Sequence, residues 1–370
     1  MKNNTILILG GYGEAGRLIA HYLLRESDVR LILAGRNLDK AQAAAAELNT
    51  TVFGQRVTAQ LLDAADQTGL EKAFAQVQMV VVASSTSQYT RNVAQAALNI
   101  GIDYLDILYS TPKLEILKSL ANQMKQQGLC FISDGGFHPG LPAAMVRYLA
   151  PEFERLETAH VGSVIKVNWE ALRLSPATIE EFVLEMLEFQ PVCFTNGEWR
   201  RDWKNRRTFD FGTVFGKQKC MAMLLEEMKS LPQNYPSLKE TGFFVGGFNW
   251  FVDNILMLPS MMILSIWRGR AIRPISRLLH WGLNKYSKPP FGTVLLLEAS
   301  GWKGKQFTKR QLIIEHGDGY LLTVLPVVAC LLQYLDGSIR KPGLWMQGNV
   351  VEPKRFFNDL QRMGVAAKIQ

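Results

Sequence analysis

Three glycines near the start of the chain have the spacing of a nucleotide-binding turn. Residues 11–16 read GYGEAG, a G-x-G-x-x-G pattern, and they follow the apolar run ILIL at 6–9. In such a turn the first glycine permits the tight bend, the second lets the backbone approach a pyrophosphate, and the third lets the helix pack closely. The N-terminus of that helix attracts phosphates. The pattern predicts a dinucleotide site formed by Gly10, Gly11, Tyr12, Gly13, Glu14, Ala15 and Gly16.

Arg36 indicates which dinucleotide binds at this turn. It lies twenty residues after Gly16, at the expected end of the second strand. NAD-binding proteins usually carry an acidic residue there for the ribose 2′-hydroxyl, whereas a guanidinium offers donors that match a 2′-phosphate. We therefore expect NADP(H) as the cofactor. Asn37 and Lys40 are further candidates for the phosphate contact, although both could be ordinary polar residues at a helix start, and Arg36 itself could be a solvated surface residue.

The elements that would position these residues alternate through the first 150 residues. Continuous apolar strands separated by helices indicate an α/β fold with a doubly wound parallel sheet. Six strands would complete both halves of a Rossmann domain, so residues 1–150 are expected to bind the dinucleotide. The expected strands cover residues 6–9, 29–34, 56–62, 79–83, 103–107 and 129–133, and helices after the first cover 38–48, 68–77, 89–100 and 114–127.

Candidate catalytic residues follow the later strands, because ligands of such sheets bind beyond the carboxyl ends of the strands. Hydride transfer needs positioning and a proton donor near the acceptor atom. His138, Asp106 and Tyr109 are the predicted catalytic residues, and Asp134 also lies at this edge. His138 titrates in a useful range but could instead position backbone at a helix start. Asp106 could equally cap a helix. Gly135 is expected to permit close approach of the cofactor.

The second part of the chain has a different pattern. From about residue 155, longer polar strands and turns replace the regular alternation, and Asn196-Gly197 is a strong hairpin signal. A mixed α+β domain over residues 151–344 is expected to hold the substrate and any dimer contact. A helix should resume near Tyr320. A C-terminal helix is expected over 353–363.

Residues 248–290 form an apolar segment followed by a basic one. Residues 248–267 (FNWFVDNILMLPSMMILSIW) carry Asp253 as their only charge, and no acidic residue occurs between Asp253 and Glu298. Apolar and basic residues in this arrangement are typical of a peripheral contact with anionic membrane. Asn254 and Pro259 argue against a span, since the clean apolar run falls short of about 20 residues. A buried helix of the second domain and a dimer interface remain alternatives.

Composition limits the other classes of function. At 370 residues the chain suits two domains, and the net charge of +8 comes without a nucleic-acid-binding motif, so no nucleic acid is expected. The four cysteines lack ligand spacing, so we expect no metal and reduced thiols. No signal peptide is visible at the N-terminus. We expect a cytoplasmic location or association with a membrane surface.

The order of motifs resembles the saccharopine dehydrogenase-like family over most of the chain. The resemblance implies an NADP-binding Rossmann domain, a mixed α/β substrate domain that can mediate homodimer formation, and a C-terminal segment from about 345 to 370 that packs back on the first domain. It also implies that Asp63 lies near the adenine and that Ser84 and Ser85 approach the nicotinamide ribose. The motifs are GGYGEAG, AGRNLDKA, LLDAAD, NVAQAALNIGIDYLDI, GGFHPGLPAAMVRYL, FTNGEWRRDW, GTVFG, LLEEMKSLPQNYP, HGDGYLLTVLPV and VVEPKRFFNDLQRMGV.

The family implies a reaction class without fixing the substrate. Its members include enzymes of lysine biosynthesis and breakdown, polyamine-related synthases and trans-acting enoyl reductases of lipid synthesis. Arginines that would hold the carboxylates of saccharopine have no match in this sequence. The expected function is NADP(H)-dependent hydride transfer to or from a carbonyl, imine or enoyl group of a small or lipid-like substrate. The alternative is a non-catalytic NADPH-binding scaffold or sensor at a membrane surface.

Overall fold

The computed structural model describes residues 4–169, 179–180, 183–184 and 189–370. The chain divides into two compact units. The first unit comprises Met1–Leu141 and Thr323–Met363, and the second comprises Pro142–Leu322 and Gly364–Gln370. The boundary predicted at residue 150 lies close to the start of α6 (Pro142–Leu149), where the second unit begins.

The first unit is built on a parallel sheet, as the sequence predicts. In the described part of the chain, the sheet has seven strands in the order β15-β6-β5-β4-β1-β2-β3, and every pairing is parallel. The strands are β1 (Thr5–Leu9), β2 (Arg30–Gly35), β3 (Val57–Leu61), β4 (Met79–Val82), β5 (Asp103–Asp106), β6 (Cys130–Ser133) and β15 (Gly343–Met346). Helices of this unit are α1 (Glu14–Glu26), α2 (Leu38–Thr50), α3 (Gln67–Phe74), the short 3₁₀ helix η1 (Ser87–Tyr89), α4 (Thr90–Ile100), α5 (Thr111–Gln126), α13 (Gln347–Val350) and α14 (Pro353–Arg362).

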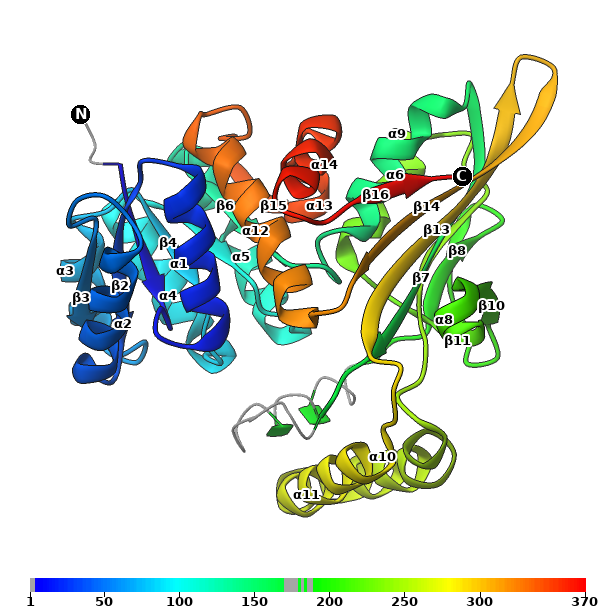
Figure 1. The fold of residues 1–370 in the computed structure, drawn as a ribbon, viewed down its shortest axis with the longest axis horizontal. Coiled ribbons are helices and arrows are strands. Elements are labelled where there is room, and N and C mark those ends of the chain that lie inside the picture. Colours follow the sequence, from blue (N-terminus) through cyan, green and yellow to red (C-terminus); the bar gives the residue numbers. More distant parts are fainter. Residues whose placement is uncertain (1–3, 170–178, 181–182, 185–188) are drawn as a thin grey trace. The chain divides into compact units, whose positions relative to one another are not determined.

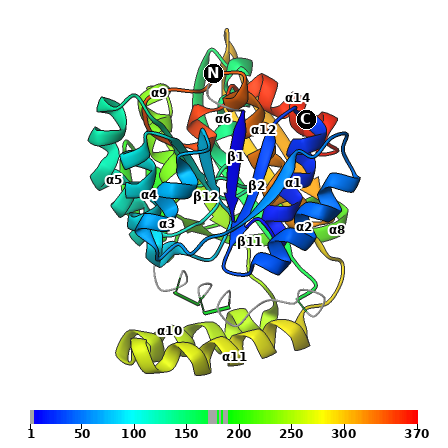
Figure 2. The ribbon, with the colours of Figure 1, turned by 90° about the vertical axis from the view of Figure 1, so that its left-hand side faces the viewer.

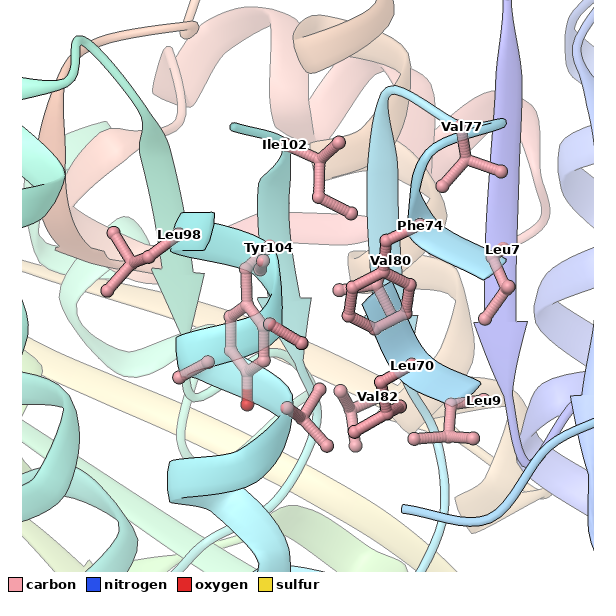
Figure 3. Close-up of a cluster of buried hydrophobic side chains, with 14 of the residues drawn as sticks. Leu7, Leu9, Leu70, Phe74, Val77, Val80, Val82, Leu98, Ile102 and Tyr104 are labelled. Carbon is pink, nitrogen blue, oxygen red and sulfur yellow. The ribbon is translucent and has the colours of Figure 1, made fainter. Parts of the chain in front are cut away.

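An apolar core holds the central strands in register. Figure 3 shows Leu7, Val80 and Tyr104, from three neighbouring strands, in one cluster with Leu70 and Phe74 of α3, and all five are almost fully buried. Both faces of these strands are apolar because helices cover both faces of the sheet. The core therefore fixes the level at which each strand ends, and with it the positions of the loops at the carboxyl edge.

Asp103, at the start of β5, ties the C-terminal segment to this sheet. Its Oδ1 accepts from the backbone N of Cys130 at 2.8 Å, and its Oδ2 accepts from Tyr334 Oη at 2.7 Å and Arg340 Nε at 2.8 Å. Tyr334 belongs to α12 (Gly319–Leu335), within which the boundary between the units falls. Tyr334 and Arg340 come shortly before β15 in the chain, so their bonds to Asp103 hold this strand next to β6. The sequence analysis did not predict β15.

The second unit contains a mixed sheet with mainly antiparallel pairing (Figure 1). Its main path runs β10-β11-β12-β7-β13-β14-β16, with β8 on β12 and β9 on β8, and the β12–β7 pair is parallel. The predicted Asn196-Gly197 turn joins β8 to β9. Strands are β7 (Arg155–Lys166), β8 (Val192–Thr195), β9 (Glu198–Arg201), β10 (Arg206–Asp210), β11 (Lys217–Met223), β12 (Glu240–Val245), β13 (Gly292–Lys303), β14 (Gln306–His316) and β16 (Ala367–Ile369). Helices include α6, η2 (Ala150–Glu152), α8 (Gly212–Phe215), η3 (Glu226–Ser230), α9 (Leu231–Asn234), the π-helix η4 (Val252–Leu256), α10 (Met257–Ile266) and α11 (Arg268–Tyr286).

The last residues correct one expectation about the C-terminus. We expected residues from about 345 to 370 to pack on the first domain, and β15, α13 and α14 do belong to the first unit. Residues Gly364–Gln370 instead belong to the second unit, where β16 pairs with β14. The physical reason is that β14 offers unpaired backbone groups along its outer edge, which an extended segment can satisfy.

Candidate functional site

The glycine turn lies at the carboxyl edge of the parallel sheet, next to the central strand. Leu9 pairs with Ala34 of β2 and with Val82 of β4, so β1 lies between these strands, and the chain turns at Gly10. Gly10 has a φ of 85°, and a Cβ there would lie 2.6 Å from Ser84 Cβ. Only glycine fits this position, because the turn after β1 and the loop after β4 are in direct contact.

The start of α1 is free to receive an anion. Gly13 is the N-cap residue, and no side chain caps the first turn of the helix. A Cβ on Gly16 would lie 2.3 Å from the carbonyl oxygen of Gly10, so Gly16 is required by the packing of helix on turn. A Cβ on Gly13 would approach only Gly10 O, at 3.2 Å. Gly13 therefore leaves its side of the turn open, which fits a pyrophosphate on the N–H groups of the helix.

Arg36 is exposed directly after β2. Among the residues that the structure describes, no ion pair involves it. The Tyr12 ring covers the preceding residue, since a Cβ on Gly35 would lie 2.4 Å from Tyr12 Cε1. Asn37 Oδ1 accepts from the backbone N of Lys40 at 2.9 Å, so Asn37 is the N-cap of α2, while Lys40 itself is exposed. Arg36 is thus available to a phosphate at the end of β2.

The other predicted cofactor residues lie on loops at the same edge. Asp63 follows β3, is exposed, and accepts at Oδ1 from the backbone N of Ala65 at 3.0 Å. Ser84 and Ser85 follow β4, and Ser84 Oγ lies 3.0 Å from Thr86 Oγ1. The topology therefore brings Arg36, Asp63 and the two serines to the edge that carries the glycine turn. Arg36 and the serines follow strands that flank β1, and Asp63 follows β3, one strand further out.

A buried lysine that the sequence analysis missed joins the ends of β5 and β6. Lys113, in the first turn of α5, is fully buried. Its Nζ donates to Asp106 Oδ1 at 2.7 Å, to Asp134 Oδ1 at 2.7 Å, to Ser133 Oγ at 2.8 Å and to the carbonyl oxygen of Leu108. Burial opposes the charge on this lysine, but the two carboxylates outweigh burial and raise its pKa. Lys113 therefore remains an ammonium ion inside the protein.

This cluster gives Asp106 a positioning role. Its side chain is fully buried, and Oδ1 accepts from Lys113 Nζ and from the backbone N of Leu108 at 3.3 Å. Oδ2 accepts from Ser133 Oγ at 3.0 Å. Burial, followed by the charge and hydrogen bonding of Asp106, raises the pKa of Tyr104 well above its usual value. The oxygens of Asp106 are thus bonded to protein donors that hold the loops after β5 and β6, and a catalytic role for Asp106 stays a prediction.

The loop after β6 is held by a second residue that the sequence analysis missed. Gln347 of α13 donates from Nε2 to Gly136 O at 3.1 Å and accepts at Oε1 from Gly136 N at 3.3 Å. Gly135 N donates to Asp106 O at 2.8 Å, and a Cβ on Gly135 would lie 2.9 Å from that oxygen. Gly135, predicted as a cofactor contact, is thus required by packing within the protein.

His138 and Tyr109 are the two predicted catalytic residues that retain some exposure. The atoms packed around His138 desolvate it and lower its pKa to about 3, so the imidazole is neutral at physiological pH. Its ring lies edge-on to Phe137, with centroids 3.9 Å apart. Tyr109 follows β5, directly after Leu108, whose carbonyl accepts from Lys113. Because β5 and β6 are neighbours, Tyr109 and His138 lie on adjacent loops.

Comparison with known proteins matches the part of the chain that carries the glycine turn and Arg36 to a domain family. Residues 6–128 match the family described as the saccharopine dehydrogenase NADP binding domain. No curated protein matches the chain in sequence.

Comparison with solved structures gives a match in fold over the whole chain and more distant ones. Apo saccharopine dehydrogenase (L-Glu forming) from Saccharomyces cerevisiae is 15% identical over 99% of both chains, with a TM-score of 0.66. A meso-dapdh mutant with DAP from Clostridium tetani is 11% identical over 97% of this chain and 99% of its own, with a TM-score of 0.46. A dehydrogenase from Chromobacterium violaceum is 11% identical over 86% of this chain and 75% of its own, with a TM-score of 0.43. The likeness to the yeast enzyme, at 15% identity, is one of fold and spans both units.

Proposed function

We propose that the protein is an NADP(H)-dependent oxidoreductase, because residues 6–128 match the saccharopine dehydrogenase NADP binding domain family. Within this class, the proposed reaction is hydride transfer to or from a carbonyl, imine or enoyl group of a small or lipid-like substrate. The observation that carries the proposal is Arg36 at the end of β2, which is exposed and has no ion pair among the described residues. It lies beside a glycine turn at which no side chain caps the first turn of α1.

These residues fit the phosphates of NADP(H). The N-terminus of α1 would hold the pyrophosphate, and the guanidinium of Arg36 would pair with the 2′-phosphate. Asn37 caps α2 with its side-chain oxygen, which leaves its amide group as a second donor near Arg36. Asp63, Ser84 and Ser85 stay candidates for the adenosine and nicotinamide ribose contacts, because each follows a strand at the edge that carries the glycine turn.

Two residues would act on the acceptor group, one by donating a proton and the other by orienting it. When bound, NADPH supplies a hydride, and a carbonyl or imine acceptor then needs a proton on its oxygen or nitrogen. Tyr109 is the proposed proton donor, because its phenol is partly exposed on the loop after β5. His138, neutral because its pKa is about 3, would orient the acceptor by a hydrogen bond. Asp106 and Lys113 would hold both loops in place.

Titration with reduced dinucleotides tests the cofactor half of this proposal. We expect NADPH to bind much more tightly than NADH, and Arg36→Ala to weaken NADPH binding while leaving NADH binding unchanged. Arg30→Ala is the matched control, since Arg30 is an exposed arginine at the opposite end of the same strand. Equal binding of the two dinucleotides by the wild-type protein would count against the 2′-phosphate site.

A substrate panel tests the catalytic half. Consumption of NADPH would be followed with amino-acid semialdehydes, cyclic imines and enoyl thioesters, and Tyr109→Phe should lower kcat for the substrate that reacts. If Tyr109→Phe keeps the wild-type kcat and its pH profile, the proposed proton donor is wrong.

A scaffold that binds NADPH without turnover is the second candidate function. This alternative is supported by Lys113, whose ammonium group binds the carboxylates of both Asp106 and Asp134. Few titratable groups at the carboxyl edge of the sheet are then left to transfer a proton to a substrate. Tight NADPH binding with no oxidation across the whole substrate panel would favour it over the enzyme.

A further inference from the structure

Helix α10 exposes three large apolar side chains along one face and buries one of its two serines. Leu258, Met262 and Ile266 are 67%, 60% and 69% exposed, whereas Ser260 is 1% exposed. The three apolar residues recur at i, i+4 and i+8, so they share one face of the helix. A helix at the surface of a water-soluble domain normally has the opposite arrangement, with polar residues outside. The exposed face of α10 is therefore suited to an apolar environment.

Helix α11 presents basic residues along its exposed face. Arg270, Arg273 and Arg277 are exposed and recur at i, i+3 and i+7, and the half-exposed Trp281 continues the same row at i+11. Arg273 Nε lies 3.4 Å from Glu180 Oε1, although the arginine stays largely exposed. Lys285 Nζ lies 5.2 Å from the centroid of the Trp281 ring. Tryptophan beside cations is typical of the boundary between lipid head groups and acyl chains.

The two helices pack on each other through their buried apolar residues (Figures 1 and 2). Together they are called the α10–α11 hairpin. Leu256 and Leu264 lie in one buried cluster with Ile275 and Leu279 of α11. A Cβ on Gly282 would lie 2.7 Å from Leu256 Cδ1, so the helices approach closely at this glycine. Because the apolar contacts between the helices are already satisfied, the exposed residues are not left over from an incomplete core.

The positive charge of the α10–α11 hairpin indicates what kind of partner its exposed surface binds. No acidic residue occurs from 254 to 297, while the segment carries Arg268, Arg270, Arg273, Arg277, Lys285 and Lys288. A symmetric contact between two copies would bring these like charges together, because a twofold interface uses the same surface on both subunits. An anionic lipid surface offers both an apolar phase for α10 and negative head groups for α11. Within the described residues, none of the helices is long and apolar enough to cross a membrane.

We propose that the α10–α11 hairpin docks the protein on an anionic phospholipid bilayer, with the exposed face of α10 in the interfacial region and the arginines of α11 on the head groups. The docking is peripheral and reversible. It is independent of hydride transfer, so its test measures lipid binding and not turnover.

Sedimentation with vesicles tests the docking. The full-length protein should pellet with vesicles of phosphatidylcholine and phosphatidylglycerol, and should pellet much less with phosphatidylcholine alone. Raising the salt concentration should weaken the binding to anionic vesicles, because salt screens exposed charges. A wild-type protein that stays in the supernatant with anionic vesicles at low salt overturns the proposal.

Two variants separate the apolar and basic contributions. Leu258→Gln/Met262→Gln/Ile266→Gln should lower partitioning on anionic vesicles by at least about tenfold, since it removes the apolar face but keeps every charge. Arg270→Gln/Arg277→Gln should lower binding to anionic vesicles by about tenfold or more and leave the weak binding to phosphatidylcholine unchanged. All five substitutions in these two variants are at exposed positions, and glutamine is a good helix former. The unfolding temperatures of both variants should therefore match that of the wild type.

The control variant is Val214→Gln/Phe307→Gln, which removes two exposed apolar side chains of the second unit outside the hairpin. It should bind vesicles as the wild type does. If the α10 variant binds anionic vesicles as tightly as the wild type, the hairpin is not the docking surface. If the wild type elutes as a dimer that the α10 variant disperses, and neither pellets with vesicles, the face binds a second copy and the lipid proposal is wrong.

Discussion

Lys113 Nζ lies 2.7 Å from Asp134 Oδ1, and this contact joins the first turn of α5 to the loop after β6. The same nitrogen lies 2.7 Å from Asp106 Oδ1, so one ammonium ion serves two carboxylates at the ends of neighbouring strands. Asp134 has a φ of 60°, a conformation that few residues other than glycine adopt, and its ion pair with Lys113 and the bond from its backbone N to Asp106 Oδ1 are among the contacts that hold it there. The edge of the sheet that carries Tyr109 and His138 therefore depends on this buried cation together with Gln347, which holds the loop after β6.

Removing that cation should destabilise the first unit strongly. Lys113→Met leaves two buried carboxylates without their partner, and we expect a loss of about 3–5 kcal/mol in the free energy of unfolding. Urea denaturation followed by circular dichroism measures this. Lys118→Met, at an exposed position of the same helix, is the control and should change the free energy by less than about 0.5 kcal/mol.

An additional variant distinguishes loss of charge balance from loss of packing. Lys113→Met/Asp106→Asn carries one buried negative charge fewer than Lys113→Met, so it should regain part of the lost stability. A double variant less stable than the single one would mean that the carboxylate of Asp106 is held mainly by Ser133 and the backbone, and not by Lys113.

The glycines of the turn should separate into structural and binding positions. Gly16→Ala places a Cβ 2.3 Å from Gly10 O and should lower both stability and NADPH affinity. Gly13→Ala meets only Gly10 O, at 3.2 Å, so it should cost little stability while weakening NADPH binding through the pyrophosphate contact. Thermal unfolding without ligand, paired with NADPH titration, measures both. The expectation fails if Gly13→Ala binds NADPH as the wild type does.

Asp103→Asn tests the attachment of the C-terminal segment to the sheet. The carboxylate accepts from Tyr334 and Arg340, and its burial makes the ion pair with Arg340 stronger than an exposed one. An amide at this position would present its NH₂ group either to the backbone N of Cys130 or to Tyr334 and Arg340, and we expect a loss of about 2–3 kcal/mol in the free energy of unfolding. Denaturation in urea checks the value, and Asp336→Asn, a more exposed acidic residue, should have a much smaller effect.

The parallel sheet was predictable because its signals are local. The strands β1 (TILIL) and β4 (MVVV) are continuous apolar runs, and the sequence analysis predicted their ends to within one or two residues. β15 was missed because its four residues, GLWM, follow a proline and pair with β6 more than two hundred residues earlier in the chain. No local pattern specifies such a pairing, so the sequence predicts the core of the sheet better than its edge.

The candidate site was predictable where spacing carries the information. The glycine turn and Arg36 follow from their distance in sequence, and the family match supports NADP(H) as the cofactor. Lys113 was missed because a lysine on a helix is ordinarily solvated. One signal was present: Lys113, Leu117, Leu120 and Met124 recur at i, i+4, i+7 and i+11, so the lysine occupies a core position of α5. The roles of Tyr109 and His138 stay predictions.

A buried histidine of the second unit should make stability depend on pH. Burial, and then the charge of Arg207, lower the pKa of His160 from 6.5 to about 3. Glu240 Oε2 lies 3.6 Å from His160 Nε2, but the glutamate is partly exposed and does not offset the burial of the ring. The histidine is therefore neutral in the folded protein and protonated in the unfolded chain at any pH between these two values.

Since the folded pKa is the lower one, the unfolded state binds the extra proton, and stability falls as pH falls from about 6.5 toward 3. At pH 5, His160 alone should lower the free energy of unfolding by about 2 kcal/mol relative to pH 7.5. His160→Gln removes the titrating group, so the difference between urea denaturation curves at the two pH values should shrink by that amount. An unchanged difference would mean that His160 protonates in the folded state with Glu240 as its partner.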